Sequence, residues 1–313
     1  MILIVGAGPM AVQYANVLKG LDQPFQVVGR NAQSAEAFHA AVGVEPCTGG
    51  IEAYFNSEHP AIQCAIVAVS VEQLEHASTY LLDQGVKRLL VEKPGGLTLE
   101  AIERLKHKAD ASGAMVYIAY NRRFLSSVIK ARELIKEDGG VTSFNFEITE
   151  WSTIQGIPKA DGVKENWFFS NTTHVTDLAF YLGGRPRQLC TFTAGSGSLS
   201  WHSRAARFCG AGETHEGALF SYSGDWEAPG RWVVEILTKK RRFIFKPLET
   251  LQVQLLNSVA VTPVDIDTTL DTQYKPGLYL QVEHFLTHNE EGLCSLAEHL
   301  ENSRTYMRIA NYV

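Results

Sequence analysis

The chain opens with MILIVGAGPMAVQYANVL, residues 1–18, and this stretch decides the fold. Residues 2–5 form a short apolar run that ends at a glycine, and apolar residues then recur at helical spacing over residues 11–18. A strand that leads through a glycine turn into a helix is the opening of a βαβ unit. The stretch therefore predicts a β-strand and an α-helix joined by a loop at residues 6–11.

Small residues occupy the positions of this loop at which a dinucleotide needs them. Gly6, Gly8 and Ala11 fill the G-x-G-x-x-G/A pattern, with Pro9 and Met10 between them. The first glycine permits the tight turn, the second lets the backbone approach a pyrophosphate, and the helix N-terminus attracts its negative charge. An ordinary βα turn is the alternative, but the pattern that follows disfavours it. We expect a dinucleotide to bind at this loop.

The first 120 residues continue to alternate between strand and helix signals. Further strands are expected at residues 25–28, 62–69, 88–91 and 115–119, and helices at residues 34–41, 71–84 and 97–109. Strands and helices that alternate at this spacing imply βαβ units and a parallel sheet. The prediction is an α/β protein in which residues 1–120 form a doubly wound, Rossmann-type NAD(P)-binding domain.

The pattern changes after a helix expected at residues 124–137. Phe144, Phe146 and Ile148 alternate with polar residues, as in an antiparallel strand with one buried face. Since 313 residues exceed one ordinary domain, residues 121–313 are predicted to form a second, α+β domain with an open, mostly antiparallel sheet. Its other strands are expected at residues 188–193, 217–222, 231–237, 242–245 and 251–256, and its helices at 171–182, 278–286 and 295–309.

Charge and cysteine content exclude several classes of protein. A net charge of -6 does not suit a general nucleic-acid binder or a protein that binds anionic membranes. The basic run at residues 239–242 is interpreted as a solvated β-turn, with a binding patch as the less favoured alternative. Five widely spaced cysteines without a CxxC pair indicate reduced thiols and no metal site. Without a leader or a membrane-length apolar run, we expect a cytoplasmic protein.

The end of the second strand bears on the choice of cofactor. An NAD site usually places an acidic residue there to bind the ribose 2′-hydroxyl. Here the strand is followed by Gly29-Arg30-Asn31, with Ser34 nearby and no acid. Arg30 could pair with a 2′-phosphate and lie against the adenine ring. We therefore favour NADP(H) as the cofactor, with NAD(H) as the alternative. The alternative without a functional role is that Arg30 is an ordinary surface arginine in a loop.

Two residues with catalytic chemistry lie further along the chain. Lys93 sits in the turn Glu92-Lys93-Pro94 at the carboxyl end of the fourth strand, the edge at which ligands bind in open α/β sheets. His174 lies on the helix expected at residues 171–182, three residues before Asp177, and a histidine can exchange protons near neutral pH. Each residue alone would more often have a structural role.

In combination, these motifs resemble the Gfo/Idh/MocA oxidoreductase family. The resemblance rests on the glycine loop, the segment from Ala68 to His76, the Glu92-Lys93-Pro94 turn, the run at residues 120–124, and the helix segment at residues 174–184. It implies a Rossmann domain followed by an α/β domain with an open sheet. It also implies nicotinamide-dependent oxidation or reduction of CH–OH groups on a sugar, cyclitol or sugar derivative, and a homo-oligomer formed through the C-terminal sheet.

The resemblance implies roles for individual residues. Lys93 matches the lysine that touches the reacting hydroxyl, and His174 matches the histidine that exchanges its proton. One departure is Ser170, which stands where the family often has an aspartate four residues before the histidine. The departure leaves three alternatives: a different mode of substrate binding through Asn171 and Thr172, a catalytically weak regulatory protein, or an imine or biliverdin-type reductase.

The expected site falls into two sets beside the catalytic pair. The residues expected to bind the cofactor are Gly6, Gly8, Pro9, Met10, Arg30, Asn31, Ser70, Glu92 and Lys93. The residues expected to contact substrate are Tyr120, Asn121, Arg123, Trp151, Asn166, Asn171, Thr172 and Asp177. His76 is expected to be structural. The candidates for the buried face of the second sheet are Val233, Ile236, Phe243 and Phe245.

Overall fold

The computed structural model describes residues 1–160 and 162–312, and the chain divides into two compact units. The first unit comprises Met1–Asn121 and Leu270–Leu300, and the second comprises Arg122–Thr269 and the residues from Glu301 onward. The chain first passes from one unit to the other after Asn121, one residue beyond the boundary expected at residue 120. The return of residues 270–300 to the first unit differs from that expectation, because β14 (Cys294–Ser295) pairs antiparallel with β5 (Met115–Ala119).

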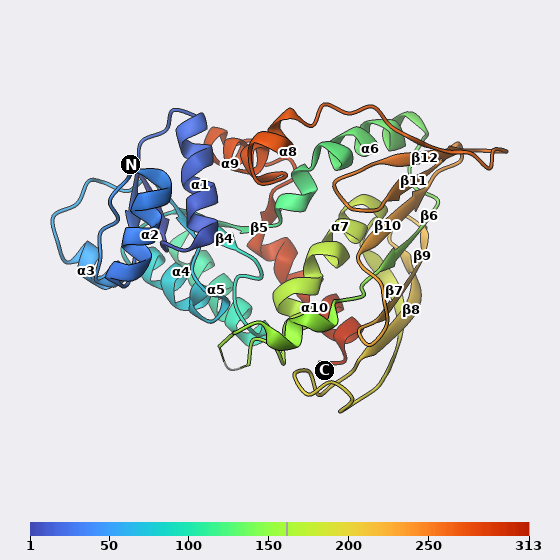
Figure 1. The fold of residues 1–313 in the computed structure, drawn as a ribbon, viewed down its shortest axis with the longest axis horizontal. Helices are drawn as coiled ribbons and strands as arrows, with labels where there is room; N and C mark the ends of the chain where they lie inside the picture. The colour runs from blue at the N-terminus through green and yellow to red at the C-terminus, as the bar shows by residue number, and fades with distance from the viewer. Residues whose placement is uncertain (161, 313) are drawn as a thin grey trace. The chain divides into compact units, whose positions relative to one another are not determined.

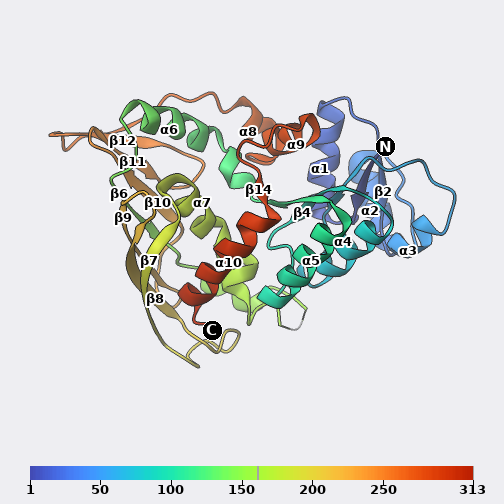
Figure 2. The ribbon, with the colours of Figure 1, turned by 180° about the vertical axis from the view of Figure 1, so that it is seen from behind.

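The first unit is built on a six-stranded sheet that is parallel except for β14. The strand order is β14-β5-β4-β3-β1-β2. Its remaining strands are β1 (Ile2–Val5), β2 (Phe25–Val28), β3 (Cys64–Val67) and β4 (Arg88–Glu92). Its helices are α1 (Pro9–Gly20), α2 (Ala32–Val42), α3 (Gly50–Phe55), α4 (Leu74–Asp83), α5 (Leu99–Ser112) and α9 (Leu278–Thr287). Figure 1 shows α1 and α2 beside this sheet, and Figure 2 shows α4 and α5 next to each other.

This strand order places a topological switch point between β1 and β3. The chain leaves β1 toward β2 on one side and returns to β3 on the other. Ligands of doubly wound sheets bind outside the carboxyl ends of the strands at such a point. The loops after β1 and β3 are therefore where this fold offers a binding site.

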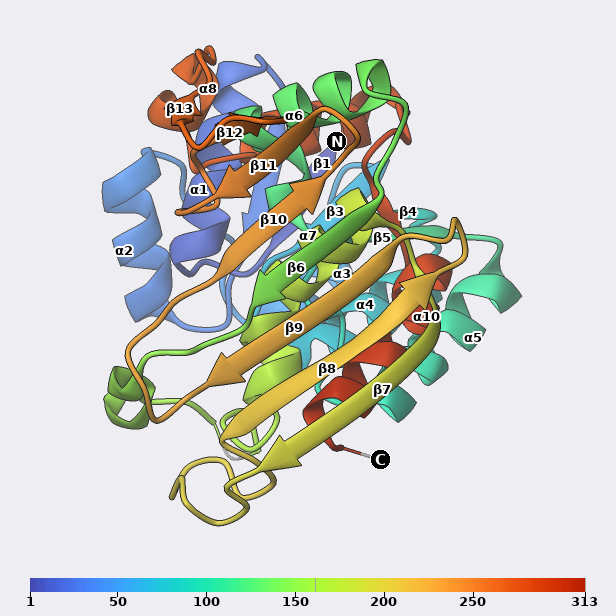
Figure 3. The ribbon, with the colours of Figure 1, turned by 90° about the vertical axis from the view of Figure 1, so that its right-hand side faces the viewer.

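The second unit is built on an eight-stranded sheet, whose strands lie side by side in Figure 3. The order is β13-β12-β11-β10-β6-β9-β8-β7, and only β6 and β9 run parallel to each other. The strands are β6 (Ser143–Glu147), β7 (Pro186–Ala194), β8 (Arg207–Thr214), β9 (Leu219–Asp225), β10 (Val233–Leu237), β11 (Arg241–Phe245), β12 (Gln252–Leu255) and β13 (Val261–Pro263).

Helix α7 (Thr173–Gly183) covers one face of this sheet and contacts β6 and β10. Phe144 and Phe146 of β6 stand edge-on to Phe180 of α7, with ring centroids 6.0 and 5.5 Å apart. The same unit contains α6 (Ser126–Glu137) and the last part of α10 (Leu296–Ala310), while α8 (Thr269–Gln273) lies where the chain returns to the first unit.

Three of the four residues expected on the buried face of the sheet are completely buried there: Ile236, Phe243 and Phe245. Val233 is half-exposed, and its neighbour Val234 is buried in its place. Side chains alternate between the two faces of a strand, so Val233 and Ile236, three positions apart, point to opposite faces. The expectation for Val233 was therefore wrong.

Candidate functional site

The glycine loop adopts the geometry that its sequence pattern predicts. Gly6 follows β1 with φ +117°, a conformation that favours glycine, and its N–H donates to the Val28 carbonyl at 2.8 Å. A Cβ at Gly6 would lie 2.4 Å from the carbonyl oxygen of Ala68, just beyond β3. Glycine at this position therefore lets the β1 and β3 loops approach each other at the switch point.

Gly8 has a different role from Gly6. It is the N-cap of α1 in an extended conformation, it provides no side-chain cap, and Pro9 follows at the first helical position. A Cβ built on Gly8 would meet no protein atom within 4 Å. The uncapped first turn of α1 is thus approachable from outside, which is the requirement for a pyrophosphate at a helix N-terminus.

A cavity of about 310 Å³ opens at this switch point. It is lined by the ends of β1, β2 and β3 and includes five expected cofactor residues: Gly6, Gly8, Arg30, Asn31 and Ser70. Pro9 borders a neighbouring hollow that also contains Gly8 and Asn31. Met10, Glu92 and Lys93 line neither of these two hollows. The cavity fits the adenosine and phosphate portion of a dinucleotide, since it joins a glycine cradle to two helix N-termini.

The second helix N-terminus in this cavity is capped by a side chain and has an arginine beside it. Asn31 caps α2, with its side-chain oxygen accepting a hydrogen bond from the Ser34 N–H at 2.9 Å. Arg30 precedes it, is exposed, and forms no ion pair with any described residue of the chain. An unengaged guanidinium beside a helix N-terminus can bind a phosphate.

The cavity also contains a carboxylate that the sequence analysis missed. Glu52, in the first turn of α3, lines the cavity together with His76, and their side chains lie 3.6 Å apart. A Cβ at Gly50 would lie 3.4 Å from the Glu52 carboxylate and 4.0 Å from Arg30 Cγ, so both residues border Gly50. The expectation of no acid holds for the end of β2, but α3 brings one to the same cavity. No motif distinguishes Glu52 from a surface residue in the sequence.

The turn that carries Lys93 is held at both ends within the first unit. Glu92, the last residue of β4, accepts a hydrogen bond from the Tyr14 hydroxyl of α1 at 2.7 Å. Burial raises the pKa of the Glu92 carboxyl, while the Tyr14 hydrogen bond and the Lys93 ammonium oppose that rise. On the other side, Nε2 of the buried His299 lies 2.7 Å from the Pro94 carbonyl oxygen. These contacts fix the backbone on either side of Lys93.

Tyr120 and Asn121, at the end of β5, are both buried in the first unit. The Tyr120 ring lies 5.6 Å from that of His299, and the Asn121 amide donates to the Pro276 carbonyl at 2.8 Å. In the first unit these residues therefore tie β5 to the returning segment 270–300.

In the second unit, His174 follows a π-turn at Phe168–Thr172. Such turns occur mostly as single insertions and frequently at functional sites. His174 is 9% exposed, and its ring centroid lies 6.0 Å from that of Trp232. Ser170, which stands in place of the expected carboxylate, donates its hydroxyl to the Asn166 carbonyl at 3.0 Å. The Asn166 amide in turn donates to Gly162 O at 2.9 Å.

Arg123 and Asp177 form a bidentate ion pair inside the second unit. Nε and Nη2 of Arg123 lie 2.8 and 2.6 Å from the two carboxylate oxygens, and each side chain is 2% exposed. The Tyr306 hydroxyl lies 3.3 Å from the same carboxylate. The structure therefore engages the two residues with each other, although both were expected to contact substrate.

A second carboxylate missed by the sequence analysis lies beside the π-turn. Glu150 is 1% exposed and accepts hydrogen bonds from Asn171 Nδ2 at 3.0 Å, Thr172 Oγ1 at 2.6 Å and Arg231 Nη1 at 2.7 Å. Its neighbour Trp151 is 57% exposed and lies under the Arg231 guanidinium. The signal available in the sequence was the acidic residue at the end of an alternating strand.

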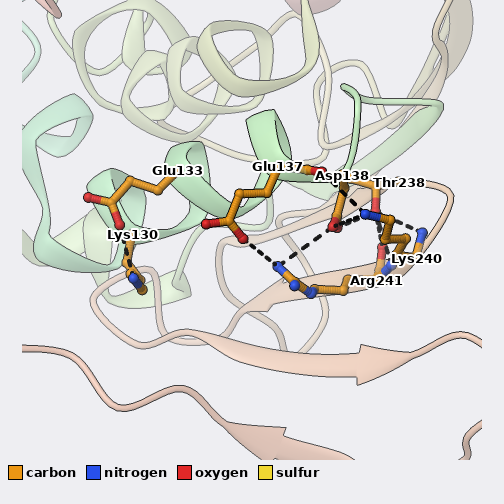
Figure 4. A network of polar contacts seen from close by, with 7 residues as sticks. All are labelled: Lys130, Glu133, Glu137, Asp138, Thr238, Lys240 and Arg241. Carbon is orange, nitrogen blue, oxygen red and sulfur yellow. Dashed lines mark hydrogen bonds and ion pairs between the residues drawn. The ribbon is translucent and has the colours of Figure 1, made fainter.

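Within the basic run at residues 239–242, ion pairs hold Lys240, Arg241 and Arg242 in the second unit, and Figure 4 shows those of Lys240 and Arg241. Lys240 and Arg241 lie 3.9 and 3.7 Å from the buried carboxylate of Asp138, which also accepts a hydrogen bond from Thr238 at 2.8 Å. Arg242 pairs with Glu235 on the adjacent strand. These ion pairs favour the interpretation as a turn over that as a binding patch.

The described residues contain neither a metal-binding cluster nor a helix that could span a membrane. Across residues 1–160 and 162–312, no group of three or more His, Cys, Asp or Glu side chains could hold a metal ion. Within those same residues, no helix has both the length and the apolar character needed to cross a bilayer.

Comparison with known proteins gives a family match for residues 1–120. Residues 1–120 match the model of the Gfo/Idh/MocA family, described as an oxidoreductase family with an NAD-binding Rossmann fold. This match confirms the resemblance seen in the sequence. A curated relative, scyllo-inositol 2-dehydrogenase (NADP(+)) IolW of Bacillus subtilis, is 26% identical over 133 residues, which cover 41% of this chain. The match spans only 37% of that relative's length.

Solved structures share the fold over nearly the whole chain. UDP-N-acetylglucosamine 3-dehydrogenase GnnA from Acidithiobacillus ferrooxidans is 15% identical with a TM-score of 0.75, over 100% of this chain and 97% of that one. Levoglucosan dehydrogenase in complex with NADH is 16% identical with a TM-score of 0.79, over 99% and 95% of the two chains. The expected architecture of a Rossmann domain and an open-sheet domain is thereby confirmed.

Proposed function

We propose that this chain, whose residues 1–120 belong to the Rossmann domain of the Gfo/Idh/MocA oxidoreductases, is an NADP(H)-dependent oxidoreductase. It would move a hydride between nicotinamide and a secondary alcohol or ketone of a sugar, cyclitol or sugar derivative. The observation that carries this proposal is the cavity at the switch point, where Gly6 and Gly8 leave room for a pyrophosphate at an uncapped helix N-terminus. The turn bearing Lys93 follows β4, the strand next to β3 in the same sheet.

The chemistry requires a proton to leave the alcohol oxygen as the hydride leaves the carbon. When bound, the nicotinamide supplies the hydride acceptor, or the donor in the reverse direction. His174 takes the hydroxyl proton, and the Lys93 ammonium donates a hydrogen bond to the same oxygen and stabilises its developing negative charge. In ketone reduction His174 returns the proton to that oxygen.

Other residues hold this arrangement or face the substrate. The buried pair of Arg123 and Asp177 is assigned a positioning role on α7, because the guanidinium and the carboxylate bind each other in a bidentate ion pair. Aromatic and amide side chains suit a polyhydroxylated ring, which presents C–H faces and hydroxyl groups. The residues proposed to contact substrate are Tyr120, Asn121, Trp151, Asn166, Asn171 and Thr172.

The preference for NADP(H) rests on Arg30. Its guanidinium lines the cavity beside the N-terminus of α2, and a 2′-phosphate there would gain a charge-assisted hydrogen bond. Glu52 opposes this preference, because a carboxylate favours a ribose hydroxyl over a phosphate. NAD(H) is therefore the alternative cofactor, and the order of the two affinities is a measurable property of this cavity.

Homo-oligomerisation through the second sheet is also part of the proposal. Phe192 of β7, Leu219 of β9 and Leu255 of β12 are 67%, 62% and 55% exposed, so apolar side chains recur along the sheet. Exposed apolar surface of this kind marks association sites. Light scattering of the purified protein should give a multiple of the 34.6 kDa chain mass; a monomeric mass would contradict the proposal.

The test of function has two stages. Fluorescence titration with NADPH and NADH should show saturable binding of at least one, and a screen of sugars, inositols and sugar nucleotides with the oxidised cofactor should then yield reduced nicotinamide. Absence of binding would overturn the proposal. Binding without turnover of any alcohol or ketone would instead favour a dinucleotide-binding regulatory protein, and turnover of imines alone would favour an imine reductase.

A further inference from the structure

We propose that Arg231 is a substrate-binding residue that selects a carboxylate-bearing sugar derivative, and that Glu150 is the positioning residue that orients it. This inference rests on the proposed function and names the substrate class for that same site. Its evidence lies wholly within the second unit, in the contacts that surround one guanidinium group. No sequence motif pointed to either residue.

Arg231 is held in one plane by two tryptophans. The centre of its guanidinium lies 4.5 Å from the Trp151 ring centroid and 4.0 Å from that of Trp232. Aromatic faces attract a guanidinium and restrict its rotation. An arginine fixed in this way loses little conformational freedom when it binds a ligand, so its hydrogen bonds retain most of their strength.

Glu150 fixes the orientation of the Arg231 guanidinium within its plane and leaves one edge of that group without a hydrogen bond to any described residue. Nη1 of Arg231 donates to Glu150 Oε2 at 2.7 Å, and no other hydrogen bond from Arg231 is formed within the described part of the chain. The Nε and Nη2 N–H groups together form the edge that matches the two oxygens of a carboxylate. The Arg231 side chain is 37% exposed, so a ligand can reach it, whereas the Glu150 side chain is fully buried.

The negative charge of Glu150 does not prevent the free edge of the Arg231 guanidinium from binding an anion. Its other oxygen, Oε1, is occupied by Thr172 and Asn171, so part of the carboxylate charge is stabilised by neutral donors. A second guanidinium, that of Arg122, lies 5.0 Å from the Trp232 ring centroid. The guanidinium groups of Arg231 and Arg122 thus both lie against the Trp232 ring.

The same contacts connect Arg231 to the proposed proton-transfer residue. The Trp232 ring that stacks against the Arg231 guanidinium also contacts the ring of His174, and the two ring centroids lie 6.0 Å apart. Glu150 binds Thr172, two residues before His174 at the end of the π-turn. A carboxylate held by Arg231 would therefore place its sugar ring against Trp151 and Trp232, on the side of the molecule where His174 lies.

The experiment compares matched pairs of ligands, namely glucose with glucuronate and galactose with galacturonate. Turnover is measured with the oxidised cofactor, and binding of the same four ligands is measured directly by calorimetry. The wild type should prefer at least one acid over its neutral partner. Arg231→Met, which keeps a side chain between the tryptophans, should raise KM and Kd for the acid by about 10- to 100-fold, the value of a charge-assisted hydrogen bond, with a smaller change for the neutral sugar.

Two further variants separate recognition from folding. Arg231→Lys keeps the charge without the planar fork and should restore less than half of the loss on a logarithmic scale. Glu150→Gln should raise KM for the acid more than KM for the neutral sugar, a difference that a merely structural role would not produce. Arg242→Met removes another arginine–glutamate pair of the same sheet and should change neither KM.

The outcomes distinguish this inference from the proposed function. Turnover in which Arg231→Met changes acid and neutral sugar equally, or leaves both unchanged, overturns the inference and leaves the function intact. Arg231-dependent binding of an acid without turnover supports the inference and counts against the function. Absence of both binding and turnover contradicts both. Glucose 6-phosphate is measured in the same assays as a fifth ligand, and a preference for it over both carboxylates overturns the substrate class.

Discussion

The Tyr14 hydroxyl donates a 2.7 Å hydrogen bond to the carboxylate of Glu92. Tyr14 lies on α1, the helix whose N-terminus is formed by the glycine loop, and Glu92 precedes Lys93. One hydrogen bond thus joins the proposed pyrophosphate site to the turn that carries the proposed catalytic lysine. Both groups lie in the first unit, so this connection depends on its internal structure alone.

Removing this hydrogen bond should destabilise the protein in a pH-dependent way. Tyr14→Phe should lower the free energy of unfolding by about 1–2 kcal/mol at neutral pH, because a buried carboxylate loses a donor. The pKa of Glu92 is already raised by burial, and losing Tyr14 should raise it further. Above the ordinary pKa of a glutamate the folded state then binds more protons than the unfolded state, so the loss should be larger at about pH 8 than at about pH 5. Urea unfolding at both pH values tests this, and a pH-independent loss would contradict it.

Substitutions at Gly8 and Gly6 should have different effects on stability, although both should weaken binding. A methyl group at Gly8 meets no protein atom, so Gly8→Ala should fold normally but block the approach of the pyrophosphate and weaken NADPH binding by at least about tenfold. Gly6→Ala should lose stability as well, because its Cβ would clash with the Ala68 carbonyl. Thermal melts and fluorescence titrations separate the two effects. Unchanged NADPH affinity in Gly8→Ala would place the dinucleotide elsewhere.

Arg30 and Glu52 should shift the cofactor preference in opposite directions. Arg30→Ala should weaken NADPH by about 10- to 100-fold and NADH much less, since only NADPH has a 2′-phosphate to pair with the guanidinium. Glu52→Gln should improve the ratio of NADPH to NADH affinity. Arg104→Ala, which removes an exposed arginine outside the cavity, serves as the matched control. Equal losses for both cofactors in Arg30→Ala would reject the phosphate argument.

His202 should make the second unit sensitive to acid. It is fully buried, with Nδ1 2.7 Å from the Ala205 carbonyl oxygen and Nε2 2.7 Å from the Tyr312 hydroxyl. Burial lowers its pKa from the ordinary value of 6.5. Below pH 6.5 the unfolded state therefore binds a proton more readily than the folded state. Stability is lost as pH falls from there toward and through the lower pKa of the folded state, by up to about 1.4 kcal/mol per pH unit.

His202→Gln should remove part of this pH dependence. Chemical unfolding followed by tryptophan fluorescence between about pH 7 and about pH 5 measures the slope. An identical slope in wild type and His202→Gln would show that other groups control the acid response.

The regular strands of both units could be predicted because their apolar periodicity is strong. The expected strands at residues 2–5, 25–28 and 115–119 match β1, β2 and β5 residue for residue. Thr98, within the stretch expected to be helical at residues 97–109, caps α5 by accepting from the Ala101 N–H. These features depend on local sequence, which is why they are visible without the fold.

Strand β8 could not be predicted, because two of its residues carry no side chain. A Cβ at Gly210 would lie 2.5 Å from the Tyr222 ring, and one at Gly212 would lie 2.6 Å from the Phe220 ring. Aromatic residues of β9 thus fill the space over these glycines. The glycines indicate a loop when they are read alone, and only the cross-strand partner explains them.

Sequence motifs pointed to some residues of the candidate site and not to those that distant segments bring together. Gly6, Gly8 and Arg30, which were expected to bind the cofactor, line one cavity. Glu52 reaches the cavity through α3, and Glu150 gains its role from Arg231, which lies 81 residues further along the chain. Arg123 and Asp177 are paired across 54 residues, and no spacing rule gives such a contact.

The most direct test of the account is the turnover number of Lys93→Ala, His174→Ala and the double variant on a substrate that the wild type oxidises. We predict that each single variant lowers kcat by about 100-fold or more, and that the double variant loses less than the product of the two, because both groups act on one oxygen. NADPH titration of His174→Ala should show binding close to that of the wild type. Turnover that is unchanged in either single variant would contradict the proposed mechanism.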